Sequence, residues 1–335
     1  MGGERRVGNE RDQRLIVVTG ASGFIGTALC AHLRARKLPF IGTVRQMTKG
    51  MASDLEPVGD LAQLSDAALE DVVGGADAVV HLAGRAHVMV EADRNPARAY
   101  AEANVDVTRR LASAAANTGV KRFVLASSVK VSGERSDAGR PFRPDDAPNP
   151  QDAYARSKLA AEQAMFDAVG ESNIVVAALR LPLVYGRNAR GNFARLVQLV
   201  ASGRRLPLAS IRNRRSLLYV GNLIEALEAA LVSPTPLAGV HFVADAESVS
   251  TPDLVRAIAH AWKVKPRLFA MPVPLLRVTG LLTGRSGVVA RLTDSLEVDT
   301  SSFRAATRWT PRWPLDAALL RAASPHRTAA SDPAF

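Results

Sequence analysis

The chain has 335 residues, a length typical of about two domains or of one large α/β unit with a smaller addition. Hydrophobic residues make up 47% and charged residues 22%, which are ordinary values for a folded globular protein and exclude wholesale disorder. The single cysteine, Cys30, excludes an internal disulfide framework and a cysteine-cluster metal site, and we expect it to lie in the core.

The net charge is +11, from 43 basic and 32 acidic residues, which favours anionic partners. Aromatic residues make up only 5%, and no basic segment is interleaved with them, so we expect no nucleic-acid partner. No apolar run reaches the roughly 18 residues that cross a bilayer. The basic start lacks the apolar region of a secretory signal. These patterns predict a soluble, cytoplasmic chain with a disordered basic tail over residues 1–13.

Short apolar runs rich in β-branched residues alternate with helical stretches in the first half of the chain. In chain order, we expect strands at 15–18, 40–44, 77–82, 123–126 and 174–179, and helices at 24–36, 97–117 and 153–169. Such alternation is typical of βαβ units, whose parallel sheet is covered on both faces. The predicted fold is α/β, a Rossmann-type doubly wound parallel sheet with a smaller mixed α/β C-terminal substrate domain.

The rhythm of strands and helices breaks after about residue 185, where prolines and glycines interrupt shorter segments. The expected parts are a nucleotide-binding domain over 14–185, to which the chain returns around 215–245, a substrate-binding part over 186–320, and a flexible tail over 321–335. Residues 271–296 are apolar enough to line a substrate pocket or a partner surface, and we favour a helix of a substrate lid.

Three glycines, Gly20, Gly23 and Gly26, follow the first expected strand and open the first helix. One makes the tight turn, one lets the backbone approach a pyrophosphate, and one lets helix and strand pack closely. The N–H groups at the start of the helix supply an anion site. The pattern therefore predicts a dinucleotide site rather than a merely structural turn, formed by Gly20, Gly23, Phe24, Ile25 and Gly26.

The end of the second expected strand indicates which cofactor is preferred. An NAD-selective site usually carries an acid there, whereas an arginine accommodates the 2′-phosphate of NADP. The residues at this point are Thr43, Val44, Arg45 and Gln46. We therefore expect Arg45 to select NADP(H) over NAD(H), the alternative being a solvated arginine. Asp60 and Leu61 are expected to contact the adenine.

Tyr154 and Lys158 are four residues apart in an expected helix, so both project from one face. A free phenol has a pKa of about 10. A nearby ammonium lowers that pKa, which makes the tyrosine a proton donor and acceptor near neutral pH. Ser128 closes the strand at 123–126, at the edge where open α/β sheets bind their ligands, and its hydroxyl can bind a substrate oxygen. We predict that Ser128, Tyr154 and Lys158 are the catalytic set.

From about residue 15 to 320 the sequence resembles the extended short-chain dehydrogenase/reductases, specifically their nucleotide-sugar epimerase, dehydratase and reductase group. Further residues that carry the resemblance are His81-Leu82-Ala83-Gly84, Asn104, Pro182-Leu183-Val184-Tyr185-Gly186, Arg215 in RRSLLYVGNL and Trp309-Thr310-Pro311. The resemblance implies that Tyr154 is the acid/base, that Lys158 holds the nicotinamide ribose and tunes Tyr154, and that Ser128 binds the reacting sugar oxygen. It also implies a UDP-sugar substrate and a homodimer. The further cofactor contacts are Leu82, Ala83, Gly84, Asn104 and Pro182, and the further substrate contacts are Asn192 and Arg215.

The residues after the strand-end serines favour one of the group's reactions. Dehydratases carry an Asp-Glu pair where this chain has Val129 and Lys130, which argues against dehydration. Ser132 replaces the usual tyrosine of the epimerases, and Arg45 favours NADPH consumed in each turnover. We therefore predict an enzyme that reduces the C4 ketone of a UDP-linked 4-keto-6-deoxy-N-acetylhexosamine for cell-surface polysaccharide of the O-antigen type. The alternatives are a UDP-hexose 4-epimerase with tightly bound NAD and, more remotely, a non-catalytic dinucleotide-binding protein.

Two further features concern possible site residues. His81 and His87 lie six residues apart, a spacing that fits neither a helix face nor a common ligand pattern, so we expect no metal site. We expect both histidines near the nicotinamide instead. Lys130 is expected either near the sugar or facing solvent.

Overall fold

Seven parallel strands form the main sheet in the order β3-β2-β1-β4-β5-β6-β9. The computed structural model describes residues 14–48, 50–85, 96–137 and 139–324. The strands of this sheet are β1 (Ile16–Thr19), β2 (Phe40–Val44), β3 (Leu55–Pro57), β4 (Ala78–His81), β5 (Arg122–Ser128), β6 (Val175–Leu181) and β9 (Gly239–Phe242). Because the strand order runs outward in both directions from β1 and β4, the topological switch point lies between these two strands. The predicted doubly wound α/β sheet is confirmed.

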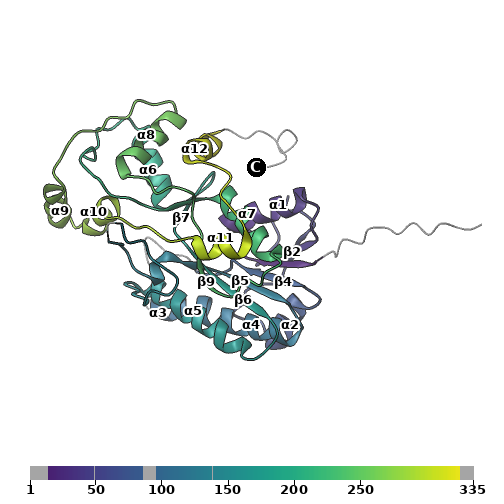
Figure 1. Ribbon diagram of the computed structural model, residues 1–335. Helices are drawn as coiled ribbons and strands as arrows, with labels where there is room; N and C mark the ends of the chain where they lie inside the picture. The colour runs from purple at the N-terminus through teal and green to yellow at the C-terminus, as the bar shows by residue number, and fades with distance from the viewer. Residues whose placement is uncertain (1–13, 49, 86–95, 138, 325–335) are drawn as a thin grey trace, which may run out of the picture.

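Helices cover both faces of the sheet (Figure 1), with α2, α4 and α5 on one face and α1 and α7 on the other. The helices of the structure are α1 (Phe24–Ala35), α2 (Asp66–Val73), α3 (Pro96–Tyr100), α4 (Val107–Asn117), α5 (Ala153–Val169), α6 (Asn192–Ala201), α7 (Val220–Val232), α8 (Thr251–Ala261), α9 (Val273–Leu282), α10 (Ser286–Thr293), α11 (Ser301–Thr307) and α12 (Leu315–Ala323). Helices are needed on both faces because the strands present apolar side chains to both faces of the sheet.

Each strand contributes to a core on either face of the sheet, because alternate side chains of a strand point to opposite faces. Ile16 and Val18 belong to the core under α1 and α7, whereas Val17 belongs to the core under α2, α4 and α5. All four residues of β1 are buried, as in a parallel strand that is covered on both faces. Cys30 lies in the first of these cores, as expected.

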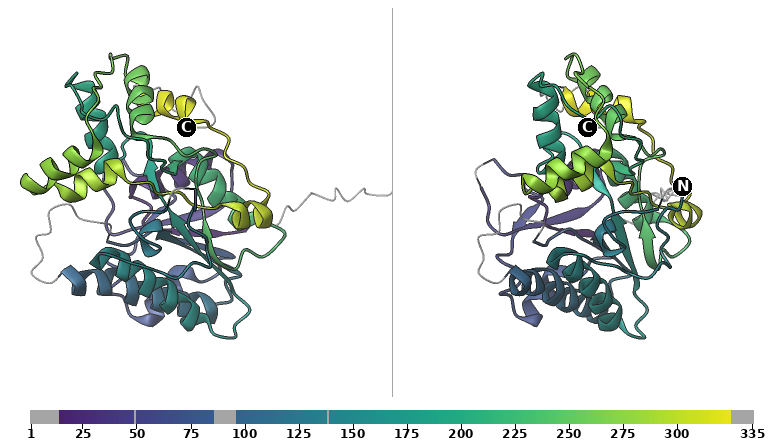
Figure 2. Two further views of the ribbon diagram at one scale, coloured as in Figure 1. Left: turned by 60° about the vertical axis from the view of Figure 1, so that its left-hand side comes forward. Right: turned by 90° about the vertical axis from the view of Figure 1, so that its left-hand side faces the viewer.

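The C-terminal half is built around a two-stranded parallel sheet, β7 (Leu183–Tyr185) and β8 (Leu217–Tyr219). Helices α6, α8 and α12 lie above this small sheet in Figure 1, on the side away from the main sheet, and α9 and α10 project to one side of it (Figure 2). The chain returns to the main sheet through α7, which packs against α1, and β9, which pairs with β6. Helix α12 continues to Ala323, so the prediction that the tail starts at residue 321 is wrong.

The expected single helix over 97–117 is also wrong in one respect, because a π-helical segment, Ala101–Asp106, separates α3 from α4. The wider turn places Asn104 in the interior, with 2% of its surface exposed, where its amide group bonds the backbone of Arg85 and the hydroxyl of Ser157. Such π segments are frequent at functional sites. The π-helical segment is therefore stabilised by contacts of Asn104 with residues that are distant in the sequence.

None of the helices in the described part of the chain is both long and apolar enough to span a membrane. The predicted basic tail over residues 1–13 and His87 lie outside the described residues.

Candidate active site

The glycine loop connects β1 to α1 at the switch point of the sheet. Gly20 has a φ of +71°, and a Cβ atom there would lie 2.7 Å from the backbone nitrogen of Ala83. A Cβ atom on Gly26 would collide with the carbonyl oxygen of Gly20. Gly23 caps α1 without a side chain, and the first turn of the helix, which begins with Phe24, holds no acidic residue. The first turn therefore presents its N–H groups to an anion, and the loop fits the pyrophosphate of a dinucleotide.

The ends of β2 and β3 carry the residues that we assigned to the adenosine. Arg45 directly follows β2 and is exposed. Asp60 is also exposed, and its carboxylate accepts a hydrogen bond from the backbone of Ala62 at 3.1 Å. Leu61 is buried, with 8% of its surface exposed. Arg45 and Asp60 therefore lie at the carboxyl edge of the sheet, where a charged side chain can meet a ligand.

His81 ties the ends of β1 and β4 together. Its Nδ1 atom lies 2.7 Å from the hydroxyl of Thr19, and its Nε2 atom lies 3.1 Å from the hydroxyl of Thr108. Burial, and secondarily the charge of Lys158, lowers the pKa of His81 to about 3, so this imidazole is neutral. Because both ring nitrogens have protein partners, His81 supports the site instead of contacting a ligand. The described residues contain no group of three or more side chains that could hold a metal ion.

The loop after β4 passes close to the predicted acid/base machinery. The Leu82 nitrogen donates a hydrogen bond to the carbonyl oxygen of Thr19 at 3.2 Å, and the Ala83 nitrogen donates to the Thr19 hydroxyl at the same distance. A Cβ atom on Gly84 would lie 2.8 Å from Asn104 Oδ1 and 3.7 Å from the ammonium nitrogen of Lys158. Glycine is therefore required where this loop meets Asn104.

Ser128, Tyr154 and Lys158 meet at the carboxyl end of β5. Asp152 caps α5 by accepting a hydrogen bond from the backbone of Ala155 at 2.7 Å, which fixes the first turn that carries Tyr154. The Tyr154 hydroxyl forms a hydrogen bond with Ser128, the last residue of β5. Lys158 donates a hydrogen bond from Nζ to the carbonyl oxygen of Ala126 at 2.9 Å. The structure thus brings together the three residues that sequence spacing singled out.

The pKa values of this set differ from our expectation. Burial raises the pKa of Tyr154 to about 12, and its hydrogen bond with Ser128 opposes this rise only in part. Burial lowers the pKa of Lys158 to about 8, against the charge of Glu162. The predicted lowering of the Tyr154 pKa is therefore wrong for this structure, because the phenol is desolvated while the ammonium is directed at the carbonyl group of Ala126.

A buried ion pair beneath the set was missed from the sequence. Glu162 accepts hydrogen bonds from Arg180 of β6, with 2.7 Å between Oε2 and Nη2, and also from the hydroxyl of Ser127. Arg180 further donates to the hydroxyl of Ser132 at 3.1 Å. The pair joins α5, β5 and β6 directly below Ser128. One signal was available, because Glu162 is one helical turn after Lys158 and shares its face.

Tyr100 is a second residue that the sequence did not single out. Its ring packs edge-on against the ring of Tyr154, with 5.9 Å between the centroids. The guanidinium of Arg85 lies over the Tyr100 ring, 5.6 Å from its centroid. The aromatic contact restricts how the Tyr154 ring can turn.

The side chain of Lys130 is neither fully exposed to solvent nor available to the catalytic set of Ser128, Tyr154 and Lys158, because it is held in ion pairs. Its ammonium pairs with Glu134 and with Asp152, each at 2.8 Å. Asp152 is also the cap of α5, so Lys130 is tied to the start of the helix that carries Tyr154. Val129 is buried. At the two positions where dehydratases carry an acid pair, this chain therefore has the buried Val129 and Lys130, whose positive charge is paired with two carboxylates.

The residues assigned to the substrate lie apart along the C-terminal half. Asn192 is the first residue of α6 and is exposed. Arg215 lies in a partly buried position just before β8 and donates from Nη1 to the carbonyl oxygen of Asp294 at 2.9 Å. Pro182 is buried between β6 and β7. The hydrogen bonds of the structure thus fix Arg215 to the segment that follows α10.

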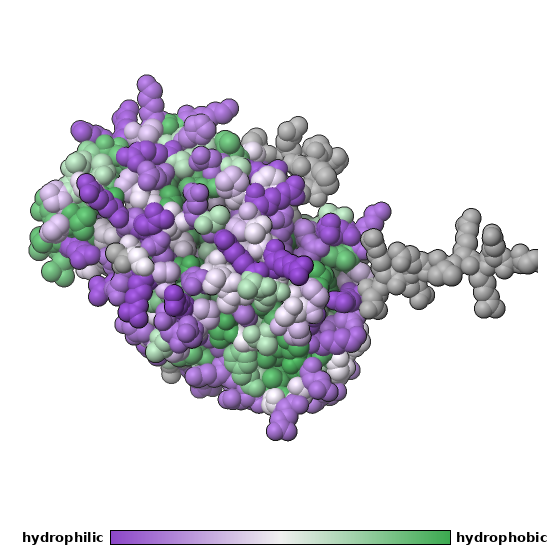
Figure 3. Space-filling model, in the orientation of Figure 1, coloured by the Kyte–Doolittle hydropathy of each residue, from purple (hydrophilic) through white to green (hydrophobic). Residues whose placement is uncertain are grey.

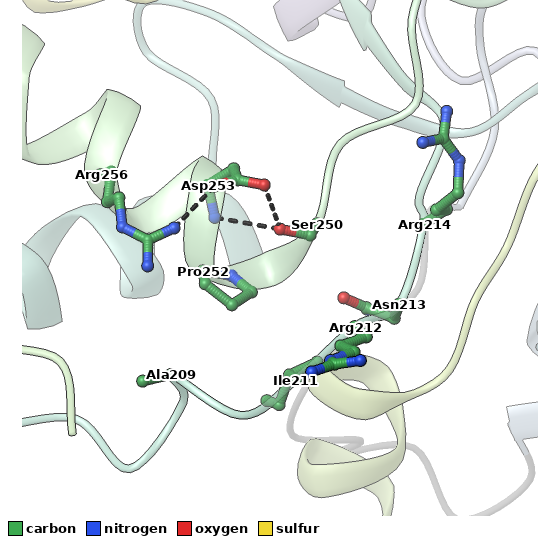
Figure 4. A pocket seen from close by; sticks show the side chains of 9 residues that line it. All are labelled: Ala209, Ile211, Arg212, Asn213, Arg214, Ser250, Pro252, Asp253 and Arg256. Carbon is green, nitrogen blue, oxygen red and sulfur yellow. Dashed lines mark hydrogen bonds and ion pairs between the residues drawn. The ribbon is translucent and has the colours of Figure 1, made fainter. Parts of the chain in front are cut away.

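A cavity of about 360 Å³ lies between residues 209–214 and the start of α8 (Figure 4). Its wall includes Arg212, Arg214 and Arg256, of which Arg256 pairs with Asp253 at 2.6 Å. None of the residues predicted for catalysis or for binding lines this cavity. It is therefore separate from the set formed by Ser128, Tyr154 and Lys158.

A doubly wound sheet, a glycine cradle at its switch point and a serine, tyrosine and lysine at its carboxyl edge together define an NAD(P)-dependent enzyme of the extended short-chain dehydrogenase/reductase type. The sequence model of the NAD dependent epimerase/dehydratase family matches residues 16–243. The chain belongs to this family.

Two relatives and one solved structure illustrate the similarity. The UDP-glucose 4-epimerase of Vibrio cholerae is 36% identical over 308 residues, which are 91% of this chain and 93% of that protein. The N-acetyl-alpha-D-glucosaminyl-diphospho-ditrans,octacis-undecaprenol 4-epimerase of Escherichia coli O157:H7 is 27% identical over 274 residues, or 80% and 77% of the two chains. The structure of MoeE5 in complex with UDP-glucuronic acid and NAD has a TM-score of 0.73 and 26% identity, and covers 92% of this chain and 97% of that chain.

Proposed function

We propose that the protein is a UDP-hexose 4-epimerase, which oxidises C4 of the sugar and reduces it again from the opposite face. The single observation that carries the proposal is the meeting of Ser128, Tyr154 and Lys158 at the carboxyl end of β5. The similarity to the epimerase of Vibrio cholerae over nearly the whole length of both chains supports it. We assign the UDP-sugar to the part over residues 186–320, with Asn192 and Arg215 as contacts.

In this proposal, Tyr154 exchanges a proton with the oxygen on C4, and Ser128 donates a hydrogen bond to the same oxygen. The oxidation of C4 needs Tyr154 as a phenolate that accepts the hydroxyl proton, and the reduction returns the same proton to the C4 oxygen, so the protons balance over one cycle. Burial, which raises the pKa of Tyr154 to about 12, opposes the first of these steps and favours the second. Lys158 binds the ribose of the dinucleotide. The dinucleotide, when bound, supplies the hydride acceptor and donor. The other cofactor contacts are Gly20, Gly23, Phe24, Ile25, Gly26, Asp60, Leu61, Leu82, Ala83, Gly84, Asn104 and Pro182.

For the cofactor, we propose a preference for NADP(H) over NAD(H). Arg45 is exposed at the end of β2, and its neighbours in the chain, Val44 and Gln46, include no acid for a ribose 2′-hydroxyl. The structure of MoeE5 holds NAD. A direct comparison of the two dinucleotides on this chain is therefore informative. A homodimer and a cytoplasmic location remain predictions.

The second candidate is the reduction of a UDP-linked 4-keto-6-deoxy-N-acetylhexosamine. Ser132 favours it, because the epimerases of the resembling group usually carry a tyrosine there, and the hydroxyl of Ser132 is engaged by Arg180 at 3.1 Å. A reductase consumes one NADPH in each turnover, which agrees with Arg45. Dehydration has no support, since Val129 is buried and Lys130 is neutralised by two carboxylates.

The experiment is product analysis with purified protein. UDP-glucose, UDP-N-acetylglucosamine and a UDP-4-keto-6-deoxy-N-acetylhexosamine are each incubated with NAD, with NADP, with NADPH and without added dinucleotide, and the products are identified by NMR. The proposal predicts that a UDP-hexose is converted into its C4 epimer without net consumption of dinucleotide. If instead the keto sugar is the only substrate that reacts, and one NADPH is oxidised for each sugar reduced, the protein is a 4-keto reductase and the epimerase proposal is wrong. No change at C4 of any substrate contradicts both.

A further inference from the structure

Helices α9 and α10 form a hairpin at one end of the molecule (Figure 2). The two helices approach closely at Gly280, where a Cβ atom would lie 2.6 Å from a methyl group of Val289. The connection is compact, because the backbone nitrogen of Arg285 donates to the carbonyl oxygen of Gly280 at 2.7 Å. Leu276 packs into the core of the C-terminal half. The hairpin is thus anchored on one side.

The other side of α9 is apolar as well, and it is exposed. Leu275, Val278 and Leu282 recur at helical spacing and are 49%, 51% and 80% exposed. Leu281 is 71% exposed, and Val288 of α10 is 46% exposed. Five of the nine large exposed hydrophobic residues in the described part of the chain thus lie on this hairpin. Figure 3 shows hydrophobic surface at the corresponding edge of the molecule. Such clustering marks an interaction surface.

The charged side chains of the segment that contains the hairpin are all basic. Residues 263–293 contain six basic residues and no aspartate or glutamate. Within the hairpin, Arg277 and Arg285 are exposed. Asp294, which pairs with Arg277 at 2.8 Å, is the first acid after this stretch. The segment therefore presents leucine and valine side chains together with arginine side chains, a composition typical of helices that lie in the interface of an anionic membrane.

We propose that the α9–α10 hairpin docks on the surface of an anionic lipid bilayer. Leu281 and Leu282 enter the boundary between headgroups and acyl chains, and Arg285 contacts lipid phosphates. The charge pattern selects this occupant over a second copy of the chain. A two-fold contact of the hairpin with itself would bring Arg285 and its copy into one interface, where residues 263–293 offer no acid and Asp294 already pairs with Arg277. An anionic lipid surface offers the complementary charge.

The test is co-sedimentation of the full chain with vesicles of phosphatidylcholine, either alone or mixed with phosphatidylglycerol. We expect binding to the mixed vesicles that falls as the salt concentration rises. Leu281→Ser/Leu282→Ser should weaken binding by about tenfold or more, because two leucine side chains no longer leave water. Arg285→Gln should weaken it and reduce its dependence on salt. Residues 1–13 also carry arginines, so all variants keep this segment.

The matched control is Val232→Ser, since Val232 is 52% exposed at the end of α7, away from the hairpin. It should bind vesicles as the unchanged chain does. Melting temperature and dinucleotide binding should be the same for all variants, because the replaced side chains are exposed. Three results would overturn the proposal. They are absence of binding to the mixed vesicles, unchanged binding of the leucine variant, and a dimer in solution that the leucine variant loses.

Discussion

Glu162 and Arg180 form an ion pair whose side chains are only 3% and 4% exposed. Glu162 belongs to α5, the helix that carries Tyr154 and Lys158, whereas Arg180 belongs to β6. Because Ser127 also donates to Glu162, the pair fixes the end of β5 relative to α5. The mutual position of Ser128 and Tyr154 therefore depends on a contact that touches neither residue.

Replacing Arg180 with methionine should lower the free energy of unfolding by about 3–5 kcal/mol, because it leaves the buried carboxylate of Glu162 without its counter-charge. Urea denaturation measures the change. The double variant Glu162→Leu/Arg180→Met removes both charges and should recover part of the loss. A single variant as stable as the unchanged protein would show that the pair contributes nothing to the fold.

Tyr154→Phe should reduce kcat about 100- to 10,000-fold, since the ring stays in place and only the proton-transferring hydroxyl is lost. Dinucleotide affinity, measured by titration calorimetry, should change little. Tyr219→Phe, in the small sheet, is the matched control and should keep full turnover. Turnover by Tyr154→Phe at the rate of the unchanged protein would contradict the role of the phenol.

Lys158 should make the stability of the protein depend on pH. Its pKa falls from 10.5 to about 8 in the folded chain, so the unfolded chain binds more protons between these two values. The free energy of unfolding should therefore gain from this residue as the pH rises through that window, and the buried charge should cost stability below it. Lys158→Met, which removes the charge, should be more stable than the unchanged protein at pH 7.

The stability difference should shrink as the pH rises from 8 towards 10.5, because Lys158 is then neutral in the folded chain and begins to lose its proton in the unfolded chain as well. Urea denaturation of both proteins at several pH values between 7 and 10.5 measures this difference. A difference that stays constant across the window would contradict the lowered pKa of Lys158.

Arg45→Ala should weaken the binding of NADP by roughly tenfold to a hundredfold and leave the binding of NAD nearly unchanged, because only NADP has a 2′-phosphate for the guanidinium to pair with. Arg109 is an exposed arginine of α4 and gives a matched control, Arg109→Ala, which should affect neither dinucleotide. Titration calorimetry with both dinucleotides measures the effect. Equal losses for NAD and NADP would contradict the assignment.

Local patterns predicted the regular parts of the fold well. The strand expected at 40–44 and the helix expected at 153–169 have the bounds of β2 and α5. The π-helical segment was missed because the partners of Asn104 come from distant parts of the chain. Spacing placed Tyr154 and Lys158 on one face, but the direction of the ammonium depends on the carbonyl group of Ala126 in another strand.

The most direct measurement follows the hydrogen on C4 of the sugar. Purified protein is incubated with UDP-glucose that carries deuterium at C4, and the product is analysed by NMR. If C4 is oxidised and reduced again at the site of Ser128, Tyr154 and Lys158, the epimer keeps the deuterium at C4, and Tyr154→Phe forms almost none. An epimer that has exchanged its label with solvent, or a Tyr154→Phe variant that is fully active, would contradict hydride transfer at this site.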